Sequence, residues 1–133
     1  MDILVYAKTT EGAGLRIQRL IETLVPREEI EIYETIDSLS CRLHQPIFHL
    51  DIAVLLATTK EELEDILSLR DLLSDVRNIL VLPDRKEETN AQGHMLRPRF
   101  ITYADGNFIE LAAVLTKVLE HTNLRKEEKD NKP

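Results

Sequence analysis

The chain has 133 residues, enough for one domain with a hydrophobic core and too few for two. Hydrophobic residues make up 43% and charged residues 31%, and the net charge of -7 argues against a nucleic-acid-binding protein, because phosphates require a basic face. The single cysteine, Cys41, excludes an internal disulfide, and no apolar run approaches the roughly 20 residues of a membrane span.

The first residues carry no feature of an export signal. Met1 and Asp2 lead directly into an apolar run, without the basic region that opens a signal peptide. A single cysteine is also typical of proteins that stay in a reducing compartment. We therefore expect a cytoplasmic protein with no nucleic-acid partner and no membrane partner.

Five short apolar runs predict β-strands, and helical patterns lie between them. The run that begins at Ile52 is almost purely apolar, which is typical of a strand that is buried on both faces at the centre of a parallel sheet. The expected strands are residues 3–7, 30–33, 52–57, 79–82 and 100–103.

Apolar residues at helical spacing predict the first helices. Residues 15–24 and 39–43 are expected to be helical, the second segment capped by Asp37 or Ser38. Thr59 starts a capping-box sequence, and the helix after it is expected to be long.

The later segments are less regular. Residues 84–98 are polar and predict irregular structure, with at most one short helix that Gly93 would weaken. Asn107 is expected to cap the last helix, in which Leu111, Leu115 and neighbouring residues form an apolar stripe.

Regular alternation of strands and helices predicts the fold class. We expect a single α/β domain over residues 1–123, doubly wound, with a five-stranded parallel sheet in the order 2-1-3-4-5 and helices on both faces. Residues 124–133 are almost all charged or polar, and we expect a disordered tail there.

Three stretches of the chain resemble response-regulator receiver domains of two-component signalling, which have a flavodoxin-like fold. They are residues 2–5, residues 51–56, and residues 100–103 followed by 108–111. The resemblance covers about residues 2 to 122. Receivers carry a phosphoacceptor aspartate after the third strand and an acidic pair that holds Mg²⁺ after the first. A serine or threonine after the fourth strand and a lysine after the fifth complete their site.

This sequence departs from the receiver pattern at every chemical position. Ala57 stands at the phosphoacceptor place, and Ala7 and Lys8 stand at the acidic pair. Pro83 follows the fourth strand, and Tyr103 or Ala104 takes the place of the lysine. Without these carboxylates no acyl phosphate can form and Mg²⁺ has no ligands.

The resemblance therefore implies a pseudo-receiver, a receiver scaffold without phosphotransfer. We expect no enzymatic activity, no cofactor and no metal. The expected function is that of a signalling or regulatory interaction module that docks to a protein partner or forms a homodimer.

An alternative hypothesis concerns the loop Lys8–Gly14, between a strand and a helix amino end. Backbone amides and the helix dipole favour anions at such a place. The loop is similar to the flavodoxin phosphate loop, and it predicts a small-ligand or anion-binding domain that uses Thr9, Thr10, Gly12 and Gly14. A tight glycine turn with no ligand is the simpler interpretation.

The predicted long helix ends near Val76 and carries more apolar residues than one sheet face needs. Its apolar stripe spans roughly 220°, whereas a helix on a sheet needs little more than 100°. Either neighbouring helices bury the excess, or Leu69, Leu72 and Val76 form a partner face. A two-fold homodimer is the assembly that this second hypothesis favours.

Other polar residues invite weaker hypotheses. Cys41, His44 and His49 lack an evident fourth ligand, so no structural zinc site is predicted. Asp84 and Asp105 both follow strands and could act as an acid–base pair, although turn or cap roles are simpler. Ordinary solvated charge is the simplest interpretation of the basic residues Arg85, Lys86, Arg97 and Arg99.

Overall fold

The computed structural model describes residues 2–8 and 12–130 of the chain, with side chains up to His121. The described residues form a five-stranded sheet in the order β2-β1-β3-β4-β5, in which all neighbouring strands are parallel. The predicted fold class and strand order are confirmed. The strands are β1 (Ile3–Tyr6), β2 (Ile30–Tyr33), β3 (Ile52–Leu56), β4 (Asn78–Leu82) and β5 (Phe100–Tyr103).

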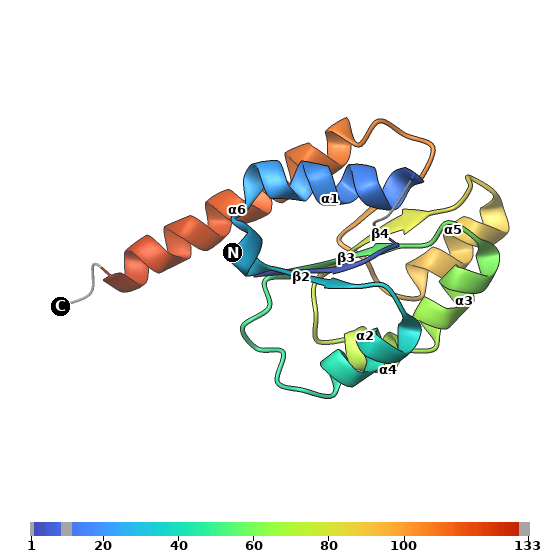
Figure 1. The fold of residues 1–133 in the computed structure, drawn as a ribbon, viewed down its shortest axis with the longest axis horizontal. Helices are drawn as coiled ribbons and strands as arrows, with labels where there is room; N and C mark the ends of the chain where they lie inside the picture. The colour runs from blue at the N-terminus through green and yellow to red at the C-terminus, as the bar shows by residue number, and fades with distance from the viewer. Residues whose placement is uncertain (1, 9–11, 131–133) are drawn as a thin grey trace.

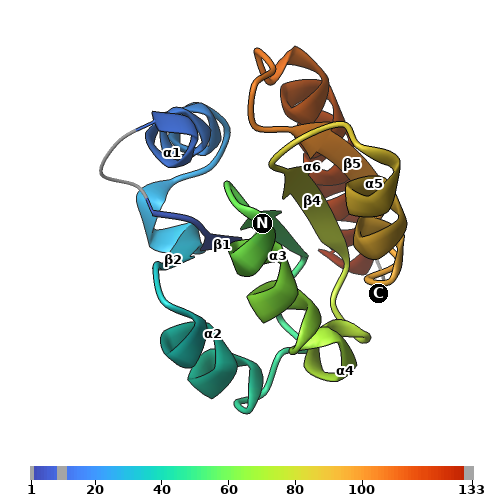
Figure 2. The ribbon, with the colours of Figure 1, turned by 90° about the vertical axis from the view of Figure 1, so that its right-hand side faces the viewer.

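Helices cover both faces of this sheet (Figure 1). α1 and α6 lie on one face, and α2 to α5 lie on the other, so the molecule has three layers (Figures 1 and 2). The helices are α1 (Gly12–Leu24), α2 (Ile36–Leu43), α3 (Lys60–Leu67), α4 (Arg70–Leu73), α5 (Glu87–His94) and α6 (Ile109–Asp130), and a 3-10 helix, η1, spans Arg27–Glu29.

β3 is the centre of the core. All five of its residues are buried, and Val54 aligns with Val5 on β1 and Ile79 on β4. Val54 packs into the apolar cluster beneath α1 and α6, whereas Leu55 packs into the cluster on the opposite face. Burial on both faces explains why the strand is apolar throughout instead of alternating.

α2 begins earlier than the sequence predicts. Thr35, and not Asp37 or Ser38, is its N-cap: the Thr35 hydroxyl oxygen accepts a hydrogen bond from the Ser38 amide at 3.1 Å. The Ser38 hydroxyl donates to the Thr35 carbonyl at 2.9 Å. A threonine in extended backbone geometry satisfies the orphan amides as well as the predicted residues would.

The prediction of a single helix from Lys60 to Val76 is wrong. α3 ends at Leu67, and Leu69 leaves helical geometry with ψ of 11° before α4 begins. The Ser68 hydroxyl donates to the Asp65 carbonyl at 2.5 Å, which competes with the regular helical pattern. The break redirects the chain, so that Leu73 is buried against the sheet.

The segment before β5 contains a full helix, α5, and Gly93 has a packing role in it. A Cβ atom at Gly93 would lie 3.1 Å from Leu80 Cδ2 and 3.2 Å from Leu82 Cδ2. The missing side chain lets α5 approach β4 closely. Gly93 is therefore a point of close contact between helix and sheet, rather than the weak point that the sequence predicts.

α6 begins as predicted but extends beyond the expected domain boundary. The Asn107 side chain accepts a hydrogen bond from the Ile109 amide at 3.1 Å. The helix then continues through residue 123 to Asp130 and projects past the sheet (Figure 1). Residues 124–130 include Leu, Arg, Lys and Glu, which have high helix propensity, and the expected disorder of residues 124–133 stays a prediction. Among the described residues, no helix combines the length and apolar content that a membrane span requires.

The edge strand β2 is tied to α2 by an ion pair. Arg42 is only 6% exposed, and its Nε donates to Glu31 Oε1 at 2.7 Å. Its Nη1 also donates to the Pro46 carbonyl at 3.1 Å. The hydrogen bond from Arg42 is the main cause that lowers the pKa of Glu31, and burial partly opposes it.

This ion pair predicts an acid-sensitive contribution to stability. Because the pKa of Glu31 is lowered in the folded state, its contribution is complete above the unfolded value of 4.5 and is lost as pH falls through the folded value. Glu31→Gln should lower the free energy of unfolding by about 1–3 kcal/mol at neutral pH, because Arg42 stays buried without its counter-charge. Urea unfolding across pH should show this difference shrinking in acid. The exposed Glu28→Gln is the control, and an equal loss in both variants would contradict the expectation.

Candidate functional site

The topology places a crevice at the carboxyl ends of the strands, between β1 and β3, where the strand order reverses. A cavity of about 340 Å³ occupies this place. The loops after β1 and β3 supply Lys8 and Thr58, the first turn of α3 supplies Glu62, and the amino end of α1 supplies Gly12 and Gly14.

The residues at the receiver positions carry no catalytic oxygen. Ala57 is fully buried after β3, and its amide donates to the Val81 carbonyl at 2.9 Å. Ala7 is buried after β1, and its amide donates to the Tyr33 carbonyl at 3.1 Å. These alanines extend the sheet by one hydrogen bond each, where a receiver would expose carboxylates.

The polar residues after β3 serve the start of α3. Glu62 Oε2 accepts hydrogen bonds from the Thr58 amide at 2.7 Å and from the Thr58 hydroxyl at 2.9 Å. The Thr59 hydroxyl oxygen accepts from the Glu62 amide at 3.1 Å, as predicted. Glu62 thus reaches one residue further back than the predicted capping box, and its carboxylate lies at the crevice.

Tyr6, the last residue of β1, packs into the apolar cluster on the α2–α5 face of the sheet. Burial is the main cause that raises the pKa of its hydroxyl, and the Glu62 and Asp65 carboxylates add to the effect. The phenol therefore stays neutral at physiological pH. It offers no phenolate nucleophile at the end of β1.

The structure brings part of the predicted anion loop together. Gly12 has a positive φ of 61° at the start of α1, and Gly14 is buried at the cavity, which Lys8 also lines. Thr9 and Thr10 lie outside the described residues. The Glu62 carboxylate stands at the same cavity, so an anion would meet both an ammonium group and a negative charge.

Two arginines that the sequence does not single out for this site make contacts near the turn between β5 and α6. Arg16 Nη2 donates to the Ala104 carbonyl at 2.9 Å, and its guanidinium lies 4.7 Å from the Phe108 ring centroid. Phe108 has a positive φ of 62°, a conformation that is costly for a bulky residue. The contact joins α1 to the β5–α6 turn.

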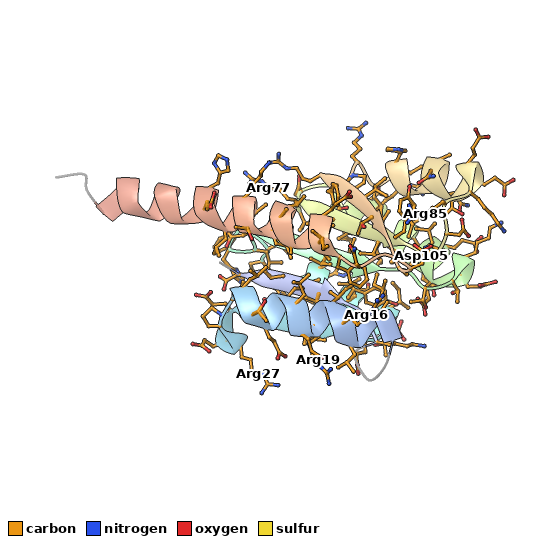
Figure 3. All side chains as sticks on the ribbon, turned by 90° about the horizontal axis from the view of Figure 1, so that it is seen from above. Arg16, Arg19, Arg27, Arg77, Arg85 and Asp105 are labelled. Atoms are coloured by element: carbon orange, nitrogen blue, oxygen red, sulfur yellow. The ribbon has the colours of Figure 1, made fainter. Side chains whose placement is uncertain are left out.

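The second arginine covers Tyr103, one of the two residues, with Ala104, that the resemblance sets against the receiver lysine. The Arg85 guanidinium lies 4.2 Å from the Tyr103 ring centroid, and Arg85 Nη2 lies 3.1 Å from Asp105 Oδ1. The Tyr103 hydroxyl donates to Asn90 Oδ1 at 2.8 Å. Arg85 and Asp105 lie together at the same end of the molecule as Arg16 (Figure 3).

The two aspartates that follow strands have structural partners. Asp84 Oδ1 accepts from the Lys86 amide at 2.9 Å, and a hydrogen bond from the Thr89 side chain is the main cause that lowers the pKa of Asp84. Asp105 pairs with Arg85. These contacts favour turn and ion-pair roles over acid–base work.

The candidate metal ligands contact different groups. His44 Nδ1 lies 2.7 Å from the Ser40 carbonyl oxygen, whereas His49 Nε2 lies 3.2 Å from Arg42 Nη2. Cys41 is exposed. In the part of the chain that the structure describes, no three His, Cys, Asp or Glu side chains group so as to hold a metal ion.

The predicted partner face packs against the protein's own core. Val76 is 6% exposed, and Leu69 and Leu72 are half-buried against the cluster that includes Leu73 and Leu80. The break between α3 and α4 lets the sheet absorb the excess apolar surface. The predicted face assumed one continuous helix, which the structure divides into α3 and α4; a partner or homodimer contact through Leu69 and Leu72 stays a prediction.

Comparison with known proteins supports the fold and goes no further. No family model and no curated protein matches the chain. Among solved structures, the fold is similar to that of a protein from Burkholderia pseudomallei K96243 described as pilus assembly-related. The TM-score is 0.60 at 19% identity, over 89% of this chain and 88% of the other. The protein is a flavodoxin-like α/β domain, the fold class to which receivers also belong.

The Arg16 contact predicts a measurable effect on stability. Arg16→Ala removes both the hydrogen bond to Ala104 and the contact with Phe108, and it should lower the free energy of unfolding by about 1 kcal/mol. Arg19→Ala, an exposed position on the same helix, should change it by less than about 0.5 kcal/mol. Urea unfolding of both variants tests this. Equal changes in the free energy of unfolding would show that the contacts of Arg16 do not stabilise the fold.

Proposed function

We propose that this protein is a non-catalytic signalling or regulatory interaction module, a pseudo-receiver that docks to a protein partner. One observation carries the proposal: Ala57, Ala7 and Lys8 occupy the positions where a receiver would hold its phosphoacceptor and its acidic pair. The parallel sheet in the order 2-1-3-4-5 supports the receiver-like scaffold.

The chemistry of phosphotransfer explains why these positions matter. An aspartyl phosphate needs a carboxylate oxygen as the nucleophile, and alanine has none. Mg²⁺ needs oxygen ligands to bridge the phosphoryl group, and the Lys8 ammonium beside the crevice would repel it. Restoring one residue would leave the other requirement unmet.

The contacts around the crevice support a module with one stable state. A receiver responds to phosphate by shifting between two states, which requires polar groups that are free to contact the phosphoryl group. Here Glu62 holds the polar groups of Thr58, and Arg85 covers Tyr103. The partner would recognise a fixed surface, so binding would be constitutive.

The cavity near Lys8 favours a second candidate, a small-anion site. Its volume of about 340 Å³ would admit a phosphate, and Lys8 supplies a positive charge. Glu62 at the same cavity opposes an anion. Inorganic phosphate without Mg²⁺ distinguishes this candidate: saturable amide shifts at Gly12 and Gly14, lost in Lys8→Ala, would favour it over the interaction module.

Acetyl phosphate with Mg²⁺ tests the leading proposal. Intact mass spectrometry should show no stoichiometric phosphate, and beryllofluoride with Mg²⁺ should leave the amide spectrum unchanged, because Ala57 offers no oxygen nucleophile. A catalytically intact receiver treated in parallel serves as the positive control. Stoichiometric phosphate on any residue near Thr58 would overturn the pseudo-receiver proposal.

A further inference from the structure

A groove of about 240 Å³ lies at the amino-terminal ends of the strands, beside the start of β4. The crevice described above lies at the carboxyl-terminal ends. Arg70 of α4 lines one side of it, and Met95, Leu96 and Arg97 of the turn after α5 line the other. Figure 2 shows α4 at the end of the sheet from which the chain enters β4. Asn78, the first residue of β4, also lines the groove.

The groove is positively charged in a negatively charged protein. Arg70 and Arg97 are both exposed, and no ion pair holds either of them within residues 2–8 and 12–121. Asp71 is the acidic residue in the lining. Arg99 lies at the same edge, because its amide donates to the Asn78 carbonyl at 2.8 Å. With a net charge of -7 overall, an acidic partner would be repelled elsewhere and steered to this edge.

The turn after α5 presents its side chains in a constrained way. Arg97 has a positive φ of 50°, and its amide donates to the His94 carbonyl at 3.0 Å. Met95 is 53% exposed beside the buried Leu96. An exposed methionine offers an adaptable apolar contact in the lining of the groove.

The floor of the groove holds an unsatisfied polar atom. Asn78 is only 2% exposed, and its Nδ2 donates to the Leu96 carbonyl at a long 3.4 Å. Its Oδ1 is buried and has no hydrogen-bond partner in the described part of the chain. A buried acceptor without a donor is costly.

We propose that this groove binds an acidic, extended segment of a partner protein. Carboxylates of the segment pair with Arg70 and Arg97, and one apolar side chain packs on Met95. The inference rests on the proposed function as an interaction module and assigns its docking surface. A folded domain is not favoured, because the groove is short and lies between a four-residue helix and a turn.

A titration followed by amide NMR tests the proposal, with an octapeptide of glutamates around one central leucine as the probe at low salt. Amides of residues 70–78 and 94–99 should shift, and added salt should weaken the binding. Arg70→Gln combined with Arg97→Gly should raise the Kd about tenfold. Glycine suits the positive φ at position 97, so this change removes the guanidinium without straining the turn.

Matched controls separate this site from a general charge effect. Arg19→Gln combined with Arg27→Gln on the α1 side removes the same charge from exposed positions and should leave the Kd within about twofold. A peptide with alanine for leucine should bind more weakly if Met95 takes part.

Several outcomes would overturn the proposal. They are an absence of shifts at millimolar peptide, equal weakening in the two double variants, inorganic phosphate producing the same shifts as the peptide, and self-association that the groove variant abolishes. Acetyl phosphate probes the other edge of the sheet, so a failed titration without phosphorylation refutes the groove and leaves the pseudo-receiver proposal in place.

Discussion

The structure depends on one strand, β3, which is buried on both faces between β1 and β4. Its side chains fill the two apolar clusters that hold the helices, so the strand itself carries no polar chemistry. The residue after its carboxyl end, Ala57, has no polar side-chain group. The same burial that secures the fold therefore leaves β3 without polar side chains.

The carboxyl-terminal and amino-terminal ends of the strands differ in whether their polar groups have partners within the protein. At the carboxyl edge, internal contacts engage Thr58, Ala104 and Tyr103. At the amino edge, Arg70 and Arg97 have no such partners in the described residues. This contrast is the physical basis for proposing a docking surface at the amino-terminal ends of the strands.

The local sequence pattern was enough to predict the sheet. It was insufficient to predict the helix break after α3 or the contacts between distant segments. The apolar run at Ile52 and the alternation of strands and helices predict the topology, because a strand buried on both faces has a distinctive composition. The α3–α4 break at Ser68 depends on a side-chain hydrogen bond that competes weakly with helix formation. Arg16 and Ala104 are 88 residues apart, and no local period indicates such a contact.

The candidate sites divide in the same way. The sequence shows that Ala57 and Ala7 stand where a receiver would have carboxylates, because the ends of the strands can be predicted from the apolar runs. The groove is not, since Arg70 and Arg97 come from separate turns that only the folded sheet brings together. The leucine face was predicted from a helical wheel, which assumes a continuous helix, whereas the structure has a break between α3 and α4.

Manganese binding tests the central claim most directly, because Mn²⁺ uses the oxygen ligands that hold Mg²⁺ in receivers and broadens nearby amide signals. The account predicts that submillimolar Mn²⁺ causes no saturable broadening at Ala7, Lys8, Ala57 or Thr58. Saturable broadening centred on these amides would contradict it, since the crevice would then be a metal site and the pseudo-receiver proposal would lose its main argument.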